Sequence, residues 1–332
     1  MESRQPGLYP YLLPHITIGE EGLFIGVNYL GECTGGDRAF LLACDGQKSI
    51  RELQSRFTSS LESEAARAAF KFLTWLEEPL ESVRPGGDEK VLVLSPYPHV
   101  GFLSLANYLV NRKGGLNCTY VSCFSRIDAT IMPEGFPLEQ NLSAIRRDEA
   151  AICARLIGSR IEFWDYPAHD VRSLGDRVPA AEAASLRQIS EKEMYHLIKM
   201  RVYRQIDEVR PQHVFGPAGL GSSDHRILFE VLLDVFKQDW FPDIHFHCYE
   251  EYPFSSDYIN VDNFLSSCEN SYVLPRNQAG DVVDAWRARC MLLDVYRSLY
   301  SDAEREEIGR VAAGSGDGWI LPERYWTLTE WC

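Results

Sequence analysis

The segment Glu89-Lys-Val-Leu-Val-Leu-Ser-Pro-Tyr-Pro-His-Val-Gly101 decides the fold. Its apolar run from Val91 to Leu94 is bounded by charged residues and by Ser-Pro, which is typical of a strand buried on both faces of a parallel sheet. Further apolar strand segments follow at 118–124, 161–164, 213–216 and 245–249. Segments of helical spacing separate them, at 103–110, 145–156, 193–209 and 226–236. This alternation predicts an α/β fold, a doubly wound and mostly parallel sheet.

Ligands of such sheets bind beyond the carboxyl ends of the strands. The site is therefore expected in the segments that follow the predicted strands: 95–101, 125–126, 166–170, 217–225 and 250–254. The glycine-rich segment 216–223 lacks the Gly-Lys-Ser/Thr of a phosphate-binding loop, and we expect it to supply backbone N–H donors near His225.

Residues 1–84 are predicted to form a separate small α+β domain of winged-helix type, and 85–332 the α/β domain. Apolar runs on both sides of Gly19-Glu-Glu-Gly22 predict a hairpin, and 38–44 predicts a short helix. Ser49 and Glu52 have the spacing of a capping box. A third helix is predicted to carry its apolar residues at Ala65, Ala69, Phe72, Leu73 and Leu76.

Composition narrows the functional classes. The 332 residues contain 33 Lys and Arg against 48 Asp and Glu, a net charge of −15, which disfavours nucleic acid as a partner. No apolar run is long enough to span a bilayer and the first residues do not form a secretory signal, so no membrane partner and a cytoplasmic location are expected. Nine scattered cysteines without Cys-x-x-Cys spacing predict reduced thiols. A homodimer is left open.

The N-terminal part resembles the PqqD-like peptide-recognition domain. The resemblance lies in Gly22-Leu-Phe-Ile, in Phe40-Leu-Leu-Ala-Cys-Asp-Gly-Gln-Lys-Ser-Ile-Arg-Glu-Leu53 and in Phe72-Leu-Thr-Trp-Leu76. It implies that residues 15–84 hold a leader or precursor peptide as an added strand beside the hairpin. The alternatives are a structural appendage and a dimerisation element.

Residues 89–330 resemble the PIG-L/LmbE-like deacetylases, zinc amide hydrolases that act on amino sugars and related natural products. The shared strings, in order, are Val91-Leu-Val-Leu-Ser-Pro-Tyr-Pro98, Arg146-Arg-Asp-Glu149 through Gly158, Trp164 with Asp170, Pro211-Gln-His-Val-Phe-Gly-Pro217 with Asp224-His225, Tyr249-Glu-Glu-Tyr-Pro-Phe254, a late helix at 286–300, and Pro322-Glu-Arg-Tyr325. The resemblance implies the fold and, by default, hydrolysis of a C–N bond.

The chain departs from that family at its metal motif. Where the family has His-Pro-Asp-Asp-Glu, with zinc ligands at the first and fourth positions and the base at the third, this chain has Tyr97, Val100 and His99. The family's later loop reads His-Pro-Asp-His, and its last histidine is retained here as His225, the only retained family ligand. The first histidine of that loop, a helper residue, is replaced by Ser222. A catalytic zinc needs three protein ligands, so no cofactor is expected unless the site is rebuilt.

Three interpretations remain open. A rebuilt metal site would join His99 and His225 with Asp224, Asp170 or His169, or with His245 and His247. In metal-free chemistry the acid–base groups would be His99, His225 and Asp224. Tyr97 would act as a hydrogen-bond donor. Substrate would then contact Arg146, His169, Asp170 and Ser222. In the third interpretation the domain is a non-catalytic pseudoenzyme that binds a peptide or a partner protein.

Each histidine taken singly is also compatible with a packed loop or core residue, and Arg146 with a surface ion pair to Glu149. The sequence thus predicts a diverged tailoring enzyme that acts on a peptide or natural-product intermediate, by C–N hydrolysis or by altered, metal-independent acid–base chemistry.

Overall fold

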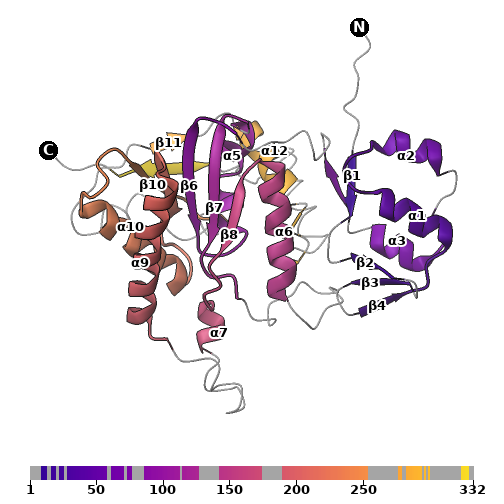
Figure 1. Ribbon diagram of the computed structural model, residues 1–332, viewed down its shortest axis with the longest axis horizontal. Coiled ribbons are helices and arrows are strands. Elements are labelled where there is room, and N and C mark those ends of the chain that lie inside the picture. Colours follow the sequence, from indigo (N-terminus) through magenta and orange to yellow (C-terminus); the bar gives the residue numbers. More distant parts are fainter. Residues whose placement is uncertain are drawn as a thin grey trace, which may run out of the picture.

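The computed structural model describes residues 9–12, 16–19, 22–25, 28–57, 61–70, 73–76, 86–112, 114–126, 142–173, 189–252, 276–278, 282–293, 295–296, 298–299 and 323–328 (Figure 1). The predicted domain boundary at 84/85 lies outside these residues. The N-terminal part of the chain contains β1 (Tyr9–Leu12), β2 (Ile16–Ile18), β3 (Leu23–Ile25), β4 (Asn28–Gly31), α1 (Gly35–Ala43), α2 (Ile50–Arg56), α3 (Glu64–Phe70) and β5 (Leu73–Leu76).

The strands β2, β3 and β4 form an antiparallel sheet with β3 in the centre. Ile16 pairs with Ile25, so the hairpin predicted around Gly19–Gly22 is confirmed. The capping box is also present at the start of α2. The Ser49 N–H donates to Glu52 Oε2 at 2.7 Å, and the Glu52 N–H donates to Ser49 Oγ at 3.3 Å.

The third N-terminal helix is shorter than predicted. Helix α3 ends at Phe70, and Leu73–Leu76 forms β5, which pairs antiparallel with β1. The spacing of Phe72, Leu73 and Leu76 suits either a helix or a short strand. Thr74 and Trp75 favour the strand, and the backbone partner that β1 supplies decides the outcome.

The larger sheet has the order β11-β12-β10-β9-β6-β7-β8. Its five parallel strands are β6 (Glu89–Ser95), β7 (Leu116–Ser122), β8 (Arg160–Phe163), β9 (His213–Pro217) and β10 (His245–Tyr249). At one edge β12 (Arg324–Thr327) pairs antiparallel with β10, and β11 (Arg276–Gln278) pairs antiparallel with β12. The predicted α/β class with a mostly parallel sheet is confirmed.

Successive residues of β6 face the two halves of the core. Val91 and Val93 pack with the helices α4 (Val100–Ser104), α5 (Ala106–Asn111), α6 (Leu142–Leu156) and α12 (Val282–Leu293). Leu92 and Leu94 pack with the helices α9 (Glu191–Val209) and α10 (Ser223–Lys237). All four side chains are fully buried, as expected for a central strand of a three-layer α/β domain (Figure 1).

One predicted helix is two. Instead of a helix at 103–110, α4 ends at Ser104 and α5 starts at Ala106. Side chains from distant segments hydrogen-bond to the backbone on both sides of the break between the two helices. Arg289 Nε donates to the Leu103 carbonyl at 3.0 Å, and Glu323 accepts from the Asn107 and Tyr108 N–H groups at 2.7 and 2.9 Å. These are long-range contacts that no local spacing contains.

Helix α6 joins the two parts of the molecule. Ile145, near its start, is 4% exposed and belongs to the apolar cluster of the N-terminal part, with Ile16, Leu23 and Leu41. The N-terminal part therefore packs against the helix that carries Arg146.

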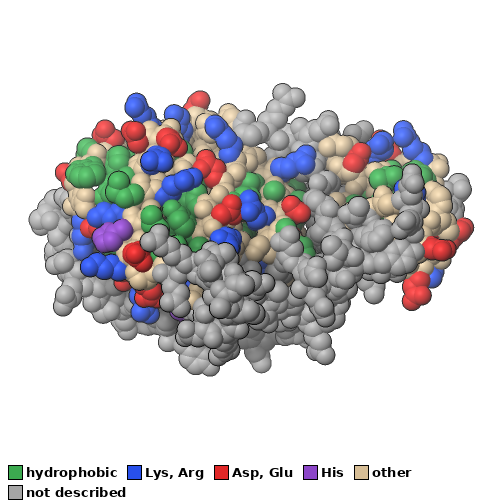
Figure 2. Space-filling view, turned by 60° about the horizontal axis from the view of Figure 1, so that its bottom comes forward, with side chains coloured by type: hydrophobic (Ala, Val, Ile, Leu, Met, Phe, Trp, Pro, Cys, Tyr) green, Lys and Arg blue, Asp and Glu red, His purple; other side chains and the backbone are tan. Residues whose placement is uncertain are grey.

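In the described part of the chain, no helix is both long and apolar enough to cross a membrane. The described cysteines are free, and most of them are buried. The excess of acidic residues does not gather on the face in Figure 2, where described Lys and Arg side chains lie among Asp, Glu and hydrophobic ones.

Candidate active site

The loop that follows β6 is held by buried phenols. The hydroxyls of Tyr120 and Tyr296 donate to the Pro98 carbonyl at 3.2 and 3.0 Å, and that of Tyr249 donates to the Leu94 carbonyl at 3.0 Å. All three rings are fully buried. Three phenols from separate parts of the chain thus fix the backbone of the segment that carries Tyr97 and His99.

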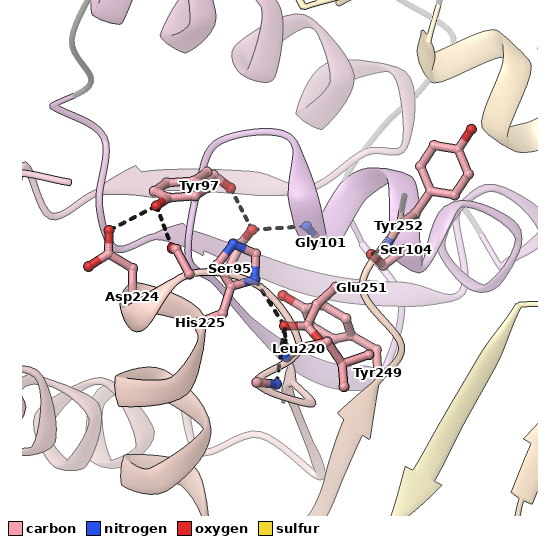
Figure 3. Close-up of polar contacts among 12 residues, drawn as sticks. Ser95, Tyr97, Gly101, Ser104, Leu220, Asp224, His225, Tyr249, Glu251 and Tyr252 are labelled. Atoms are coloured by element: carbon pink, nitrogen blue, oxygen red, sulfur yellow. Dashed lines mark hydrogen bonds and ion pairs between the residues drawn. The ribbon is translucent and has the colours of Figure 1, made fainter. Parts of the chain in front are cut away.

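Ser95 closes the same loop from within. Its hydroxyl donates to the Tyr97 carbonyl at 2.5 Å and accepts from the Gly101 N–H at 2.9 Å (Figure 3). A Cβ at Gly101 would come within 3.0 Å of Tyr120. Glycine is needed at this position because the helix start lies against that ring.

The opposite wall is the first turn of α10. This helix begins at Ser223, not at 226 as predicted, so Asp224 and His225 lie in a helical turn with fixed directions. Ser222 is the N-cap, but its hydroxyl does not cap the helix; it pairs with Tyr97 Oη at 2.9 Å. A Cβ at Gly221 would lie 2.8 Å from the His225 ring.

Tyr97 is bonded to this turn by its hydroxyl, which donates to Asp224 Oδ2 at 2.9 Å. Burial and the adjacent Asp224 carboxylate raise the pKa of Tyr97 above its ordinary value. The phenol therefore stays protonated, and it acts as a hydrogen-bonding group rather than as an anion.

Asp224 is fully buried and both of its oxygens are occupied. Oδ2 also accepts the backbone N–H of His169 at 2.7 Å, and Oδ1 forms an ion pair with Arg172 at 2.6 Å. Both partners belong to α7 (His169–Ser173). Asp224 thus fastens α7 to the site.

His225 forms a buried pair with Glu251, which follows β10. The His225 Nδ1 and Glu251 Oε1 atoms are 2.9 Å apart, and both side chains are fully buried. Glu251 also accepts the N–H groups of Gly219 and Leu220 at 3.1 and 3.0 Å. The predicted backbone donors of the glycine-rich segment therefore serve the carboxylate that holds His225. Figure 3 shows the ring between Tyr97 and Glu251.

His99 faces the same space. Its ring lies 6.2 Å from that of Tyr97 and 6.0 Å from that of Tyr296. Its Nδ1 atom is buried and, within the described ranges, has no hydrogen-bond partner. Burial, with the nearby charges of Arg146 and His225, lowers the pKa of His99 well below its ordinary value. His99 is therefore a neutral imidazole at pH 7.

Arg146 is 6% exposed and acts on the charge state of His99, so it lies toward the site and not on a helix surface. Glu149, the predicted surface partner, is fully buried and accepts the N–H and hydroxyl of Ser298 at 2.9 and 2.6 Å. The side chain of His169 pairs with Ser223, whereas Asp170 Oδ1 accepts the N–H of Val171 in its own helix.

His245 and His247 lie elsewhere. His245 is the first residue of β10 and His247 its middle residue, and His245 pairs with His213 at the start of β9. The site lies at the opposite, carboxyl ends of these strands. The rings of His245 and His247 share one face, as predicted. His213 Nδ1 is 2.9 Å from His247 Nε2, and the His213 and His245 rings stack at 5.3 Å. The structure thus contradicts a metal site that joins this pair to His99 and His225.

Two residues of the site were not among the predicted ones. Glu251 lies in the strand-end segment 250–254 that the sequence indicated, but nothing local distinguishes it from Glu250, which pairs with Arg324 instead. Arg172 had no signal of its own, since its role depends on how α7 meets Asp224.

Comparisons with known proteins agree with this fold. No family model matches the chain, and no curated protein sequence matches it. Among solved structures, a deacetylase–teicoplanin complex of the teicoplanin pathway has a TM-score of 0.53 at 14% identity, over 73% of this chain and 99% of that one. The complex of a teicoplanin-pathway deacetylase with "bog" gives 0.51 at 15%, over 72% and 98%.

A zinc-inhibited form of teicoplanin deacetylase also gives a TM-score of 0.51, at 16% identity over 72% of this chain and 98% of that one. These neighbours are deacetylases of the LmbE/PIG-L-like fold, so that part of the predicted resemblance is confirmed for the fold. At such identities the likeness defines the architecture and leaves the chemistry to the residues of the site.

Those residues do not fit the zinc ion that the fold implies. Val100 offers no ligand atom, Tyr97 is a protonated phenol bonded to Asp224, and Asp224 is occupied by Arg172. Over the described ranges, no group of three or more His, Cys, Asp or Glu side chains is arranged to hold a metal ion.

Proposed function

We propose that this chain is a diverged tailoring enzyme of LmbE/PIG-L-like fold that cleaves a C–N bond in a natural-product intermediate by acid–base chemistry at His225, without zinc. The observation that carries the proposal is the fully buried pair of His225 and Glu251 at the carboxyl ends of β6, β9 and β10. Ligands of doubly wound sheets bind at this edge.

The pair has the geometry of an oriented base. A carboxylate on Nδ1 favours the tautomer with the proton on Nδ1, which leaves Nε2 as the basic nitrogen of His225. Nε2 would take a proton from a water molecule as its oxygen attacks an amide carbonyl carbon. The same proton would pass to the departing amine when the C–N bond breaks.

Charge on the carbonyl oxygen needs a partner in place of the metal. The neutral His99 ring can donate one hydrogen bond to that oxygen in the tautomer that carries Nδ1–H, and the buried cation Arg146 lies close enough to affect the pKa of that ring. Preorganised donors of this kind stabilise an oxyanion most in a site that excludes water.

We further propose that the N-terminal part presents a peptide to this site. In its described three-stranded sheet β3 is central, so an added strand would pair with β2 or β4. Ile145, which packs in the N-terminal cluster, is followed directly by Arg146 of the site. A peptide held there would lie next to α6, the helix that carries Arg146.

The test is turnover by the full chain. A panel of N-acylated amino sugars, peptides and pathway intermediates would be incubated with the protein, and acyl release followed by mass spectrometry. We expect release that persists in excess chelator and falls at least about 100-fold in His225→Ala, the loss typical of a missing general base. Saturable peptide binding without turnover of any compound would favour the non-catalytic alternative.

A further inference from the structure

Ser223 and His169 form a hydroxyl–imidazole pair that the chemistry proposed for His225 does not use. Ser223 Oγ and His169 Nδ1 are 2.8 Å apart, within the range of a nucleophile and its base. Ser223 is the first residue of α10 and His169 the first residue of α7. Two separate elements therefore meet at this pair.

Buried contacts fix the meeting of the two helices. The backbone N–H of His169 donates to Asp224, the residue after Ser223, at 2.7 Å. Arg172, one turn further along α7, forms its ion pair with the same carboxylate, and the two side chains are 8% and 0% exposed. The buried Asp224 network thus fixes the backbone positions of Ser223 and His169, while the Ser223–His169 hydrogen bond itself is exposed to solvent.

A pocket opens beside the serine. Ser223 lines a cavity of about 380 Å³ between the first turns of α9 and α10, within the size range of small-molecule sites. Ile227 and Tyr195 give it an apolar side, and the Tyr195 hydroxyl is held by Asp234 at 2.6 Å. Lys192 of α9, together with Arg226 and Glu230 of α10, lines the cavity with both signs of charge.

We infer that Ser223 is a nucleophile for acyl transfer, with His169 as its base. Ser223 Oγ attacks the carbonyl carbon of an ester or amide while its proton passes to His169 Nδ1. Collapse of the tetrahedral adduct breaks the bond to the leaving oxygen or nitrogen, which takes that proton, and leaves an acyl ester on Ser223. Water, deprotonated by His169, then releases the acid and frees the serine.

The walls of the pocket define the substrate class. Ile227 and Tyr195 suit a short acyl or aryl group, and the opposite charges of Arg226 and Glu230 suit a zwitterionic carrier such as an amino acid or short peptide. This inference does not depend on the chemistry proposed for His225, because it uses the Ser223–His169 pair, whereas that chemistry uses the His225–Glu251 pair.

The test is covalent labelling of the full chain with an alkyl fluorophosphonate, which reacts with activated serines. Peptide mapping of the unaltered protein should place one adduct on Ser223. Labelling should vanish in Ser223→Ala and slow at least about 100-fold in His169→Gln, while Ser55→Ala, a serine of α2, keeps the full rate. Thermal melting would confirm that each variant is folded.

An unlabelled wild-type chain, or an adduct that maps to another residue, would overturn the inference, and this result requires no variant to fold. The two proposals fail separately. His225→Gln should keep the Ser223 adduct while it loses the acyl release described above. Labelling that is lost in His169→Ala and restored by excess imidazole would further support His169 as the base.

Discussion

Removal of Glu251 should destabilise the protein strongly, and the size of the effect follows from its contacts. Its carboxylate is fully buried and accepts from His225 at 2.9 Å, Gly219 at 3.1 Å and Leu220 at 3.0 Å. Glu251→Ala leaves three donors without this acceptor: the buried groups of His225 and Gly219 and the partly buried Leu220 N–H. Each unsatisfied group costs about 1–3 kcal/mol, and with partial relaxation we expect a loss of about 4 kcal/mol.

Glu251→Gln separates charge from hydrogen bonding. Oε1 accepts all three donors, so a carbonyl oxygen at that place would keep them. Only the additional strength of a charged acceptor is lost, and we expect a decrease of about 1–2 kcal/mol. Urea unfolding of the wild type and both variants measures the difference. If Glu251→Ala lies within about 1 kcal/mol of the wild type, the carboxylate does not hold the site together.

Three further predictions concern other residues. His247 is 5% exposed, and burial with the nearby His213 and His245 lowers its pKa to about 3. The contribution of the neutral His247 to stability is therefore complete above the ordinary pKa of about 6.5 and is lost as the pH falls toward 3. Between pH 7 and pH 5 the free energy of unfolding of the wild type, measured by urea titration, should fall by about 2 kcal/mol more than that of His247→Gln. Equal decreases would contradict this. Gly221→Ala places a Cβ 2.8 Å from the His225 ring and should lower acyl release at least about 10-fold, whereas Gly35→Ala, with open space around the new Cβ, should leave it unchanged. Tyr97→Phe removes a donor from Asp224 and should lower the free energy of unfolding by about 1–3 kcal/mol; an unchanged value would show that the hydroxyl contributes nothing.

The sequence predicted the sheet because its strands are local signals. A run such as Val91–Leu94 is apolar throughout only where both faces are covered, and each run also marks where a loop must start. The positions of these loops were sufficient to predict that Tyr97, Asp224 and His225 lie at one edge of the sheet, where the structure places them.

The pairing of charges could not be predicted in this way. Glu250 and Glu251 are identical neighbours in sequence, yet one pairs with Arg324 and the other with His225, because successive residues leave a strand in opposite directions. The misassigned residues 73–76 have the same cause. Their partner, β1, is more than 60 residues away in the chain, so local spacing does not contain it.

Elemental analysis of the purified full chain by mass spectrometry tests the central claim most directly, since it asks whether His225 works as a base or as a metal ligand. We predict zinc far below one atom per chain, and acyl release that is unaffected by chelation. A stoichiometric zinc that is retained through dialysis against chelator, and that disappears in His225→Ala, would contradict the account.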